Sequence, residues 1–226
     1  MFSLKSKGFK KKDIFAQFFL HSDMENVLKR YFGYDSFRPY QREIIENIMN
    51  GRPSLVLMPT GGGKSLCYQL PALIMEGTAI VISPLISLMR DQVRQLRSNG
   101  IQAIALNSSE EDFDMMTLQR ECQDSLVKLI FLSPERLLLE LPRLLRTIRI
   151  SLIAVDEAHC ISQWGHDFRP EYSQLGILRE KFPDVPIVAL TATADKGTRF
   201  DILNQLNIPD AEVFVGSFDR PHLSLF

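Results

Sequence analysis

The sequence has no closely spaced cysteines, no long apolar run and almost no net charge. Its three cysteines, Cys67, Cys122 and Cys160, lie far apart without a CxxC pair, which argues against a disulfide framework or a zinc site and favours a reducing cytosol. No apolar run approaches the ~20 residues that span a bilayer, so we expect no membrane partner. Because 26 Lys and Arg face 27 Asp and Glu, a nucleic-acid partner would require a local basic surface.

The length of 226 residues and a hydrophobic content of 45% suit one well-buried domain. Five lysines between Lys5 and Lys12 precede an apolar stretch, as in a signal peptide, but Asp13 and Gln17 interrupt it and no small-residue cleavage site follows. We therefore expect residues 1–23 to form a flexible basic extension and residues 24–226 to form a single domain.

Short apolar runs alternate with segments of helical length from about Met24 onward. Nearly continuous apolar runs are typical of strands buried on both faces of a parallel sheet. The strands are expected at Ser54–Met58, Thr78–Ser83, Gln102–Leu106, Lys128–Ser133, Leu152–Asp156 and Ile187–Thr191. Helices are expected at Leu85–Ser98 and Pro134–Thr147, with Pro84 and Pro134 in their first turns. This alternation predicts an α/β domain with a mostly parallel sheet flanked by helices.

A glycine-rich segment after the first expected strand predicts a phosphate-binding loop. It reads Met58-Pro59-Thr60-Gly61-Gly62-Gly63-Lys64-Ser65, with Met58 where the usual pattern has glycine. Backbone amides from Thr60 to Gly63 and the following helix N-terminus would surround a phosphate. Lys64 would reach the β- and γ-phosphates of ATP, and the Ser65 hydroxyl would bind Mg²⁺. The alternative is a glycine-rich turn with an incidental lysine.

Two adjacent carboxylates end another expected strand. Asp156 and Glu157 follow an apolar run directly, and buried acids are costly unless a cation or substrate uses them. Asp156 is expected to bind Mg²⁺, and Glu157 is expected to polarise the attacking water. His159 is a candidate relay between nucleotide and nucleic acid, or else a hydrogen-bonded structural histidine.

At this point the sequence resembles the RecQ family of superfamily 2 DNA helicases, from about Met24 to the last residue. Phosphate loops and Asp-Glu-Ala-His sequences occur in many helicases, whereas the stretch from Cys160 to Pro170 is far more particular. The matching segments are FGY (32–34), FRPYQ (37–41), MPTGGGKSLCYQ (58–69), SPLISLMRDQV (83–93), SPERL (133–137), VDEAHCISQWGHDFRPEY (155–172), ALTATA (189–194) and SFDRP (217–221). The resemblance implies a RecA-like P-loop NTPase domain.

The same resemblance implies the binding residues. Tyr34, Arg38 and Gln41 would hold adenine, with Tyr34 as a stacking face and Gln41 reading the base edge. An aromatic-rich loop would bind single-stranded DNA through stacking and charge. The expected DNA-binding residues are Arg90, Trp164, His166, Phe168 and Arg169. The alternative for Trp164, the only tryptophan, is a core position. The segments 83–93 and 133–137 would line the DNA groove, although Ser-Pro before a helix is often only a cap.

The implied activity is 3′→5′ DNA unwinding driven by ATP with Mg²⁺, in DNA repair and recombination, in the cytoplasm of a bacterium. Such motors bind ATP between two RecA-like domains, and the second supplies an arginine that stabilises the transferred phosphoryl group. We expect single-stranded or junction DNA and that second domain as partners, and no unwinding by this chain alone. The alternatives are a stand-alone ATP-gated nucleic-acid-binding module and an RNA helicase; the Asp-Glu-Ala-His strand end speaks against a small-molecule kinase.

Overall fold

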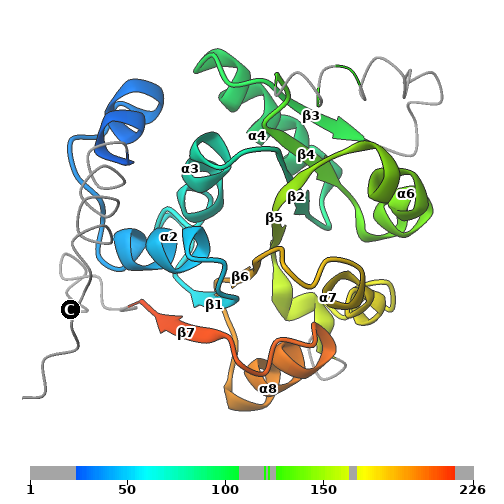
Figure 1. The fold of residues 1–226 in the computed structure, drawn as a ribbon. Coiled ribbons are helices and arrows are strands. Elements are labelled where there is room, and N and C mark those ends of the chain that lie inside the picture. Colours follow the sequence, from blue (N-terminus) through cyan, green and yellow to red (C-terminus); the bar gives the residue numbers. More distant parts are fainter. Residues whose placement is uncertain (1–23, 107–119, 121, 123–125, 163–166, 217–226) are drawn as a thin grey trace, which may run out of the picture.

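The computed structural model describes residues 24–106, 120, 122, 126–162 and 167–216. Seven strands form one sheet in the order β3-β4-β2-β5-β6-β1-β7, and every pair of neighbours is parallel. The strands are β1 (Ser54–Leu57), β2 (Thr78–Ile82), β3 (Ala103–Leu106), β4 (Leu129–Leu132), β5 (Ile150–Val155), β6 (Ile187–Thr191) and β7 (Glu212–Val215). The sheet runs through the middle of the molecule (Figure 1).

Helices cover both faces of this sheet. On one face lie α2 (Gln41–Met49), α3 (Leu66–Ile74) and α4 (Ile86–Ser98); on the other lie α6 (Pro134–Thr147), α7 (Ile177–Lys181) and α8 (Lys196–Gln205), as Figure 1 shows. The side chains of β1 alternate accordingly. Leu55 and Leu57 pack toward α6, α7 and α8, whereas Val56 packs toward α2, α3 and α4. The core is therefore two apolar layers separated by the sheet.

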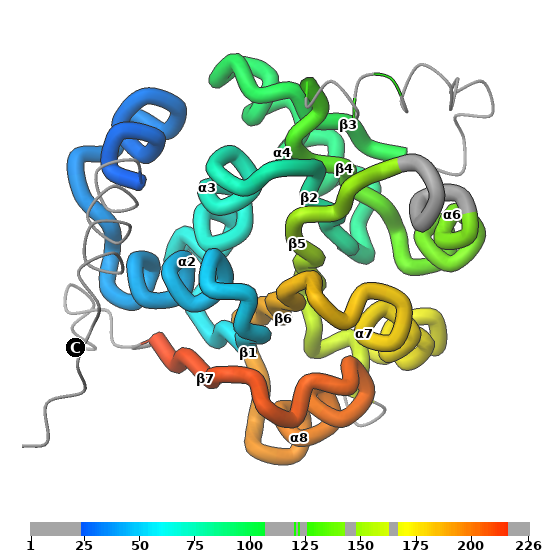
Figure 2. Tube along the Cα trace, viewed as in Figure 1, coloured from blue at the N-terminus to red at the C-terminus, as the bar shows by residue number. Residues whose placement is uncertain are grey.

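The chain before β1 forms a third, smaller cluster. A helical segment that ends in the π-helical turn η1 (Leu28–Phe32) buries Met24 and Leu28 against α2 and α3. Figure 2 traces this segment beside α3, away from the sheet centre. Gly33 ends it in the left-handed conformation, with φ of 74°, which glycine adopts without strain. The segment that follows thus runs across the carboxyl end of β1.

The expected α/β class with a parallel sheet is confirmed, and all six expected strands are present with boundaries that differ by at most two residues. Helix α6 starts at Pro134 as expected, whereas α4 starts at Ile86, so Pro84 lies just before its first turn. Strand β7 was not predicted. Among its residues only Phe214 is buried, because β7 pairs on one side alone. Across the described residues, no helix has the length and apolarity to cross a membrane.

Candidate functional site

A cleft of about 530 Å³ opens at the carboxyl edge of the sheet. Open parallel sheets commonly bind ligands at this edge, and the volume is typical of small-molecule sites. Two backbone hydrogen bonds join the ends of neighbouring strands at this cleft. The Met58 amide donates to the Thr191 carbonyl at 3.2 Å, and the Asp156 amide donates to the Ile82 carbonyl at 2.8 Å. The ends of β1, β6, β5 and β2 are thereby held in one layer. The glycine-rich loop and the acidic strand end, about 90 residues apart in sequence, line the same cleft.

The glycine-rich loop joins β1 to α3 and requires glycine for two separate reasons. Gly63 has φ of 84°, a left-handed conformation that strains other residues. A Cβ atom on Gly62 would lie 2.8 Å from the Pro59 carbonyl oxygen, so the loop can close this tightly only without a side chain. The Lys64 ammonium donates to the Met58 carbonyl at 3.2 Å. The lysine therefore lies over the loop rather than in solvent.

Arg38, which lies just before α2, and Gln41, the first residue of α2, both bind this loop. The Gln41 side-chain amide nitrogen donates to the Gly63 carbonyl at 3.1 Å, and its oxygen accepts from the Arg38 backbone amide at 2.8 Å. The Arg38 guanidinium donates to the Gly61 carbonyl. Gln41 is thus oriented by two bonds and still has one N–H and one lone pair available. Tyr34 lines the same cleft with 53% of its surface exposed.

The pKa values of the two adjacent acids, Asp156 and Glu157, are shifted in opposite directions. Burial, and then the charge of Glu157, raise the pKa of the Asp156 carboxyl to about 6. A hydrogen bond from His159 lowers the pKa of Glu157, although partial burial opposes it. Glu157 has φ of 49°, a left-handed conformation that costs a non-glycine residue about 1–3 kcal/mol and is common at functional sites. The strained residue is thus the carboxylate that ionises more readily.

His159 connects the acidic pair to β6. Its Nδ1 atom lies 3.0 Å from the Thr191 hydroxyl and 3.3 Å from the Glu157 carboxylate, and its Nε2 atom lies 3.6 Å from Asp167. Hydrogen bonding to Cys160, followed by hydrogen bonding to Glu157, raises the pKa of the imidazole. Thr191 in turn donates to the Thr193 carbonyl at 3.0 Å. The histidine thus lies in a polar chain between β5 and β6, a geometry that suits either a relay or a structural role.

The raised pKa of Asp156 predicts a stabilising substitution. The ordinary pKa of an aspartate is 3.8, and that of Asp156 in the folded chain is about 6. Between these two pH values Asp156 keeps its proton in the folded chain and has lost it in the unfolded chain, so ionising Asp156 at higher pH costs stability. Asp156→Asn should therefore raise the free energy of unfolding of the ligand-free chain by ~2 kcal/mol at about pH 8. Chemical denaturation should show that this gain disappears near pH 4. The exposed Asp184→Asn is the control, and equal gains at both pH values would contradict the assignment.

The oxygen ligands in the cleft fit Mg²⁺. The Ser65 hydroxyl and the Asp156 carboxylate both line it, and Mg²⁺ prefers oxygen ligands, usually one or two from protein with phosphates and water completing the shell. Among residues 24–216 that are described, no group of three His, Cys, Asp or Glu side chains is arranged to hold a metal.

A second cleft, of about 380 Å³, lies beside the first. Phe168 and Arg169 line it together with Glu157 and His159. The Arg169 backbone amide donates to the Cys160 carbonyl at 3.0 Å, and its guanidinium donates to the Pro84 carbonyl at 3.1 Å. Because Glu157 also lines the first cleft, this one carboxylate borders both spaces.

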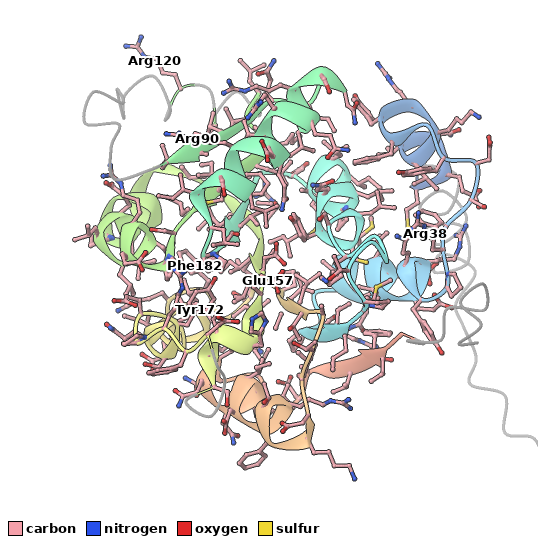
Figure 3. All side chains as sticks on the ribbon, turned by 180° about the vertical axis from the view of Figure 1, so that it is seen from behind. Arg38, Arg90, Arg120, Glu157, Tyr172 and Phe182 are labelled. Atoms are coloured by element: carbon pink, nitrogen blue, oxygen red, sulfur yellow. The ribbon has the colours of Figure 1, made fainter. Side chains whose placement is uncertain are left out.

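The other residues expected to bind DNA are more scattered. Arg90 is exposed on α4 but lies outside the second cleft; in Figure 3 it and Arg38 lie on opposite sides of Glu157. Trp164 and His166 lie outside the described residues, as does the segment 217–221. Ser83 is fully buried, and the Ser133 hydroxyl accepts from the Arg136 amide at 3.3 Å. Ser133 is thus the helix cap that Ser-Pro often indicates.

The sequence reasoning did not single out Gln92 or Tyr68. Gln92, on α4, lines the first cleft and is 9% exposed, and the fully buried Tyr68 of α3 donates its hydroxyl hydrogen to the Gln92 side-chain oxygen at 2.5 Å. Gln92 had been assigned, within the segment 83–93, to the DNA groove. The structure places it at the first cleft, which Asp156 also lines. Tyr172 was not singled out either, although its hydroxyl donates to the Asp156 carbonyl at 3.2 Å. Figure 3 shows Tyr172 close to Glu157.

Comparison with known proteins identifies the family. The family model described as "DEAD/DEAH box helicase" matches residues 38–200, a span that runs from Arg38 through the phosphate loop and acidic pair to α8. The chain belongs to the DEAD/DEAH box helicase family. Its ATP use follows from that membership. The expected RecA-like helicase fold agrees with a solved structure, that of the DUF1998 helicase MrfA, which covers 86% of this chain with a TM-score of 0.65 at 19% identity, over 32% of its own length.

The relatives of this DEAD/DEAH box helicase include proteins named ATP-dependent DNA helicase RecQ. The one from Pasteurella multocida is 51% identical over 98% of this chain, and the one from Haemophilus influenzae is 53% identical over 88%. The expected resemblance to RecQ helicases is therefore confirmed. The chain spans 35% and 32% of the lengths of these two relatives, so it corresponds to about a third of each.

Proposed function

We propose that this chain is the ATP-binding motor domain of a RecQ-type DNA helicase, which couples ATP hydrolysis to 3′→5′ unwinding in DNA repair and recombination. The observation that carries this proposal is the position of Glu157, which borders both the cleft with the phosphate loop and the cleft with Phe168 and Arg169. One carboxylate can then respond to nucleotide on one side and to nucleic acid on the other.

The nucleotide is held by residues from two segments. Loop amides and Lys64 bind the phosphates, since backbone N–H groups and an ammonium both stabilise dense negative charge. Tyr34 stacks on the base, and Gln41 uses its remaining N–H and lone pair on the adenine edge, a pattern that glutamine matches. Arg38 and Gln41 are also bonded to the loop. Recognition of adenine is therefore linked mechanically to the phosphate-binding backbone.

Hydrolysis depends on the acidic pair. Ser65 and Asp156 would hold Mg²⁺, which would neutralise the charge that develops on the transferred phosphoryl group. Glu157, kept ionised by His159, orients and polarises the attacking water. Hydrogen bonds from His159 to Thr191 and from Thr191 to Thr193 connect the end of β6 with the Glu157 carboxylate. Lys64 thus acts on the phosphates, whereas Glu157 acts on the attacking water.

Nucleic acid is bound on the side of the second cleft. Phe168 offers a stacking face, and Arg169 has donors left after its bond to Pro84 for phosphate contact or cation–π interaction. Trp164, His166 and Arg90 are proposed to extend this surface. Ser162 is buried and donates to Asp201 of α8 at 2.7 Å. That bond anchors the chain where the aromatic-rich loop begins.

A second RecA-like domain is proposed to complete the ATP cleft and supply the arginine that stabilises the transition state. We also propose a cytoplasmic location, which suits a DNA substrate and three buried cysteines without a CxxC pair. Single-stranded DNA, or a junction that exposes it, is the proposed nucleic-acid partner.

The proposal is tested by ATP hydrolysis and strand separation in a preparation that includes the second RecA-like domain. Single-stranded DNA should stimulate hydrolysis, and a duplex with a 3′ tail should be unwound in preference to one with a 5′ tail. Stimulation by RNA of the same sequence, and not by DNA, would favour the RNA helicase alternative. Nucleic-acid binding that depends on ATP without any turnover would instead support a stand-alone gated module.

A further inference from the structure

Buried polar side chains from two different helices meet beside the metal-binding carboxylate. Helix α4 buries Met89, Gln92, Val93 and Leu96, a stripe at helical spacing in which Gln92 alone carries an amide. A buried amide is costly unless it is hydrogen-bonded. Its position in the apolar stripe therefore requires specific partners.

Tyr68 orients that amide. The Tyr68 ring lies in the apolar cluster between α3 and the sheet, and its hydroxyl donates to the Gln92 oxygen at 2.5 Å. Because the oxygen of the amide accepts this bond, the amide nitrogen must point the other way, into the cleft that Gln92 shares with Asp156. Both side chains are nearly buried there, with 9% of Gln92 and 5% of Asp156 exposed.

The Glu157 backbone amide donates to one oxygen of the Asp156 carboxylate at 3.0 Å. The Gln92 amide nitrogen is directed into the same cleft from α4. Ser65, the other proposed Mg²⁺ ligand, lines the same cleft. Partners of this kind fix the orientation of metal ligands and typically affect metal affinity by about 10–100-fold.

We propose that Gln92 is a positioning residue, oriented by Tyr68, which holds Asp156 in the conformation that binds the Mg²⁺ of the nucleotide complex. This inference rests on the proposed function, because it assumes nucleotide in the first cleft. Gln92 itself need not touch nucleotide. Its effect is therefore confined to the metal-dependent part of binding.

The experiment is calorimetric titration of the chain with ADP, in Mg²⁺ and in EDTA. Gln92→Met keeps the side-chain length and removes both hydrogen-bonding atoms. We expect it to reduce the gain in affinity that Mg²⁺ provides by about tenfold, with affinity in EDTA unchanged. Tyr68→Phe should reduce the same gain by a smaller factor, since it removes only the bond that orients the amide.

The control is Gln205→Met, which makes the same change at an exposed position on α8, outside the first cleft, and should leave both affinities unchanged. Binding of ADP in EDTA reports that each variant is folded. An undiminished Mg²⁺ gain in Gln92→Met would overturn the inference, as would equal losses in Mg²⁺ and EDTA. If the unmodified chain binds no ADP under either condition, the proposed function fails instead.

Discussion

Glu157→Gln should slow ATP hydrolysis by roughly 10²–10⁴-fold while ADP and ATP still bind, in a preparation that includes the second RecA-like domain. The amide keeps the size of the side chain and meets the same backbone demand at φ of 49°, but it cannot accept a proton or polarise water as a carboxylate does. Steady-state turnover and calorimetric affinity, measured on the same protein, separate these two effects.

The control for this prediction is Glu180→Gln, which removes a carboxylate from the exposed side of α7 and should change neither quantity. Glu157→Gln also removes one of the groups that raise the pKa of His159, so the imidazole should titrate at lower pH in this variant than in the unmodified protein. NMR titration would detect that shift. Loss of nucleotide binding with undiminished turnover per bound ATP would assign Glu157 to binding and not to hydrolysis.

Much of the fold was predictable because both faces of the sheet are covered. Strands buried on both faces must be apolar throughout, so β1, β2 and β4 appear in the sequence as short continuous apolar runs. Strand β7 lacks this signal, because one long side of it is unpaired and its residues are mostly exposed. The exact start of α4 also escaped prediction, since Pro84 is equally compatible with a first turn or with the residues before it.

The site was predictable where its residues are neighbours in sequence. The phosphate loop and the Asp156–Glu157 pair are contiguous motifs, and parallel topology brings the ends of their strands to one edge. Tyr68 and Gln92 are 24 residues apart and meet only because α3 and α4 pack on the same face. A signal did exist: Gln92 interrupts the apolar stripe of an amphipathic helix. The helical spacing places Gln92 on the buried side of α4 and Arg90 on its exposed side, so this spacing could have distinguished the two residues.

Replacing Lys64 by alanine should weaken ADP binding by roughly 10–100-fold, because a charge-assisted hydrogen bond contributes about 1.5–3 kcal/mol and each 1.4 kcal/mol is tenfold in affinity. The effect on hydrolysis should be larger. Lys64 also lowers the pKa of both Asp156 and Glu157 by its charge, so its removal weakens the metal ligand and the proposed base together. Calorimetry with Mg²⁺ and ADP measures the first effect directly.

The matched control is Lys181→Ala on exposed α7, which removes an equal charge far from the loop and should leave ADP affinity unchanged. Comparison in EDTA distinguishes the two contributions of Lys64, since direct phosphate contact is lost under both conditions and the electrostatic support of Asp156 only when Mg²⁺ is present. Undiminished ADP binding by Lys64→Ala would mean that the lysine stays on the Met58 carbonyl, where it lies in this structure, and that the loop amides alone hold the phosphates.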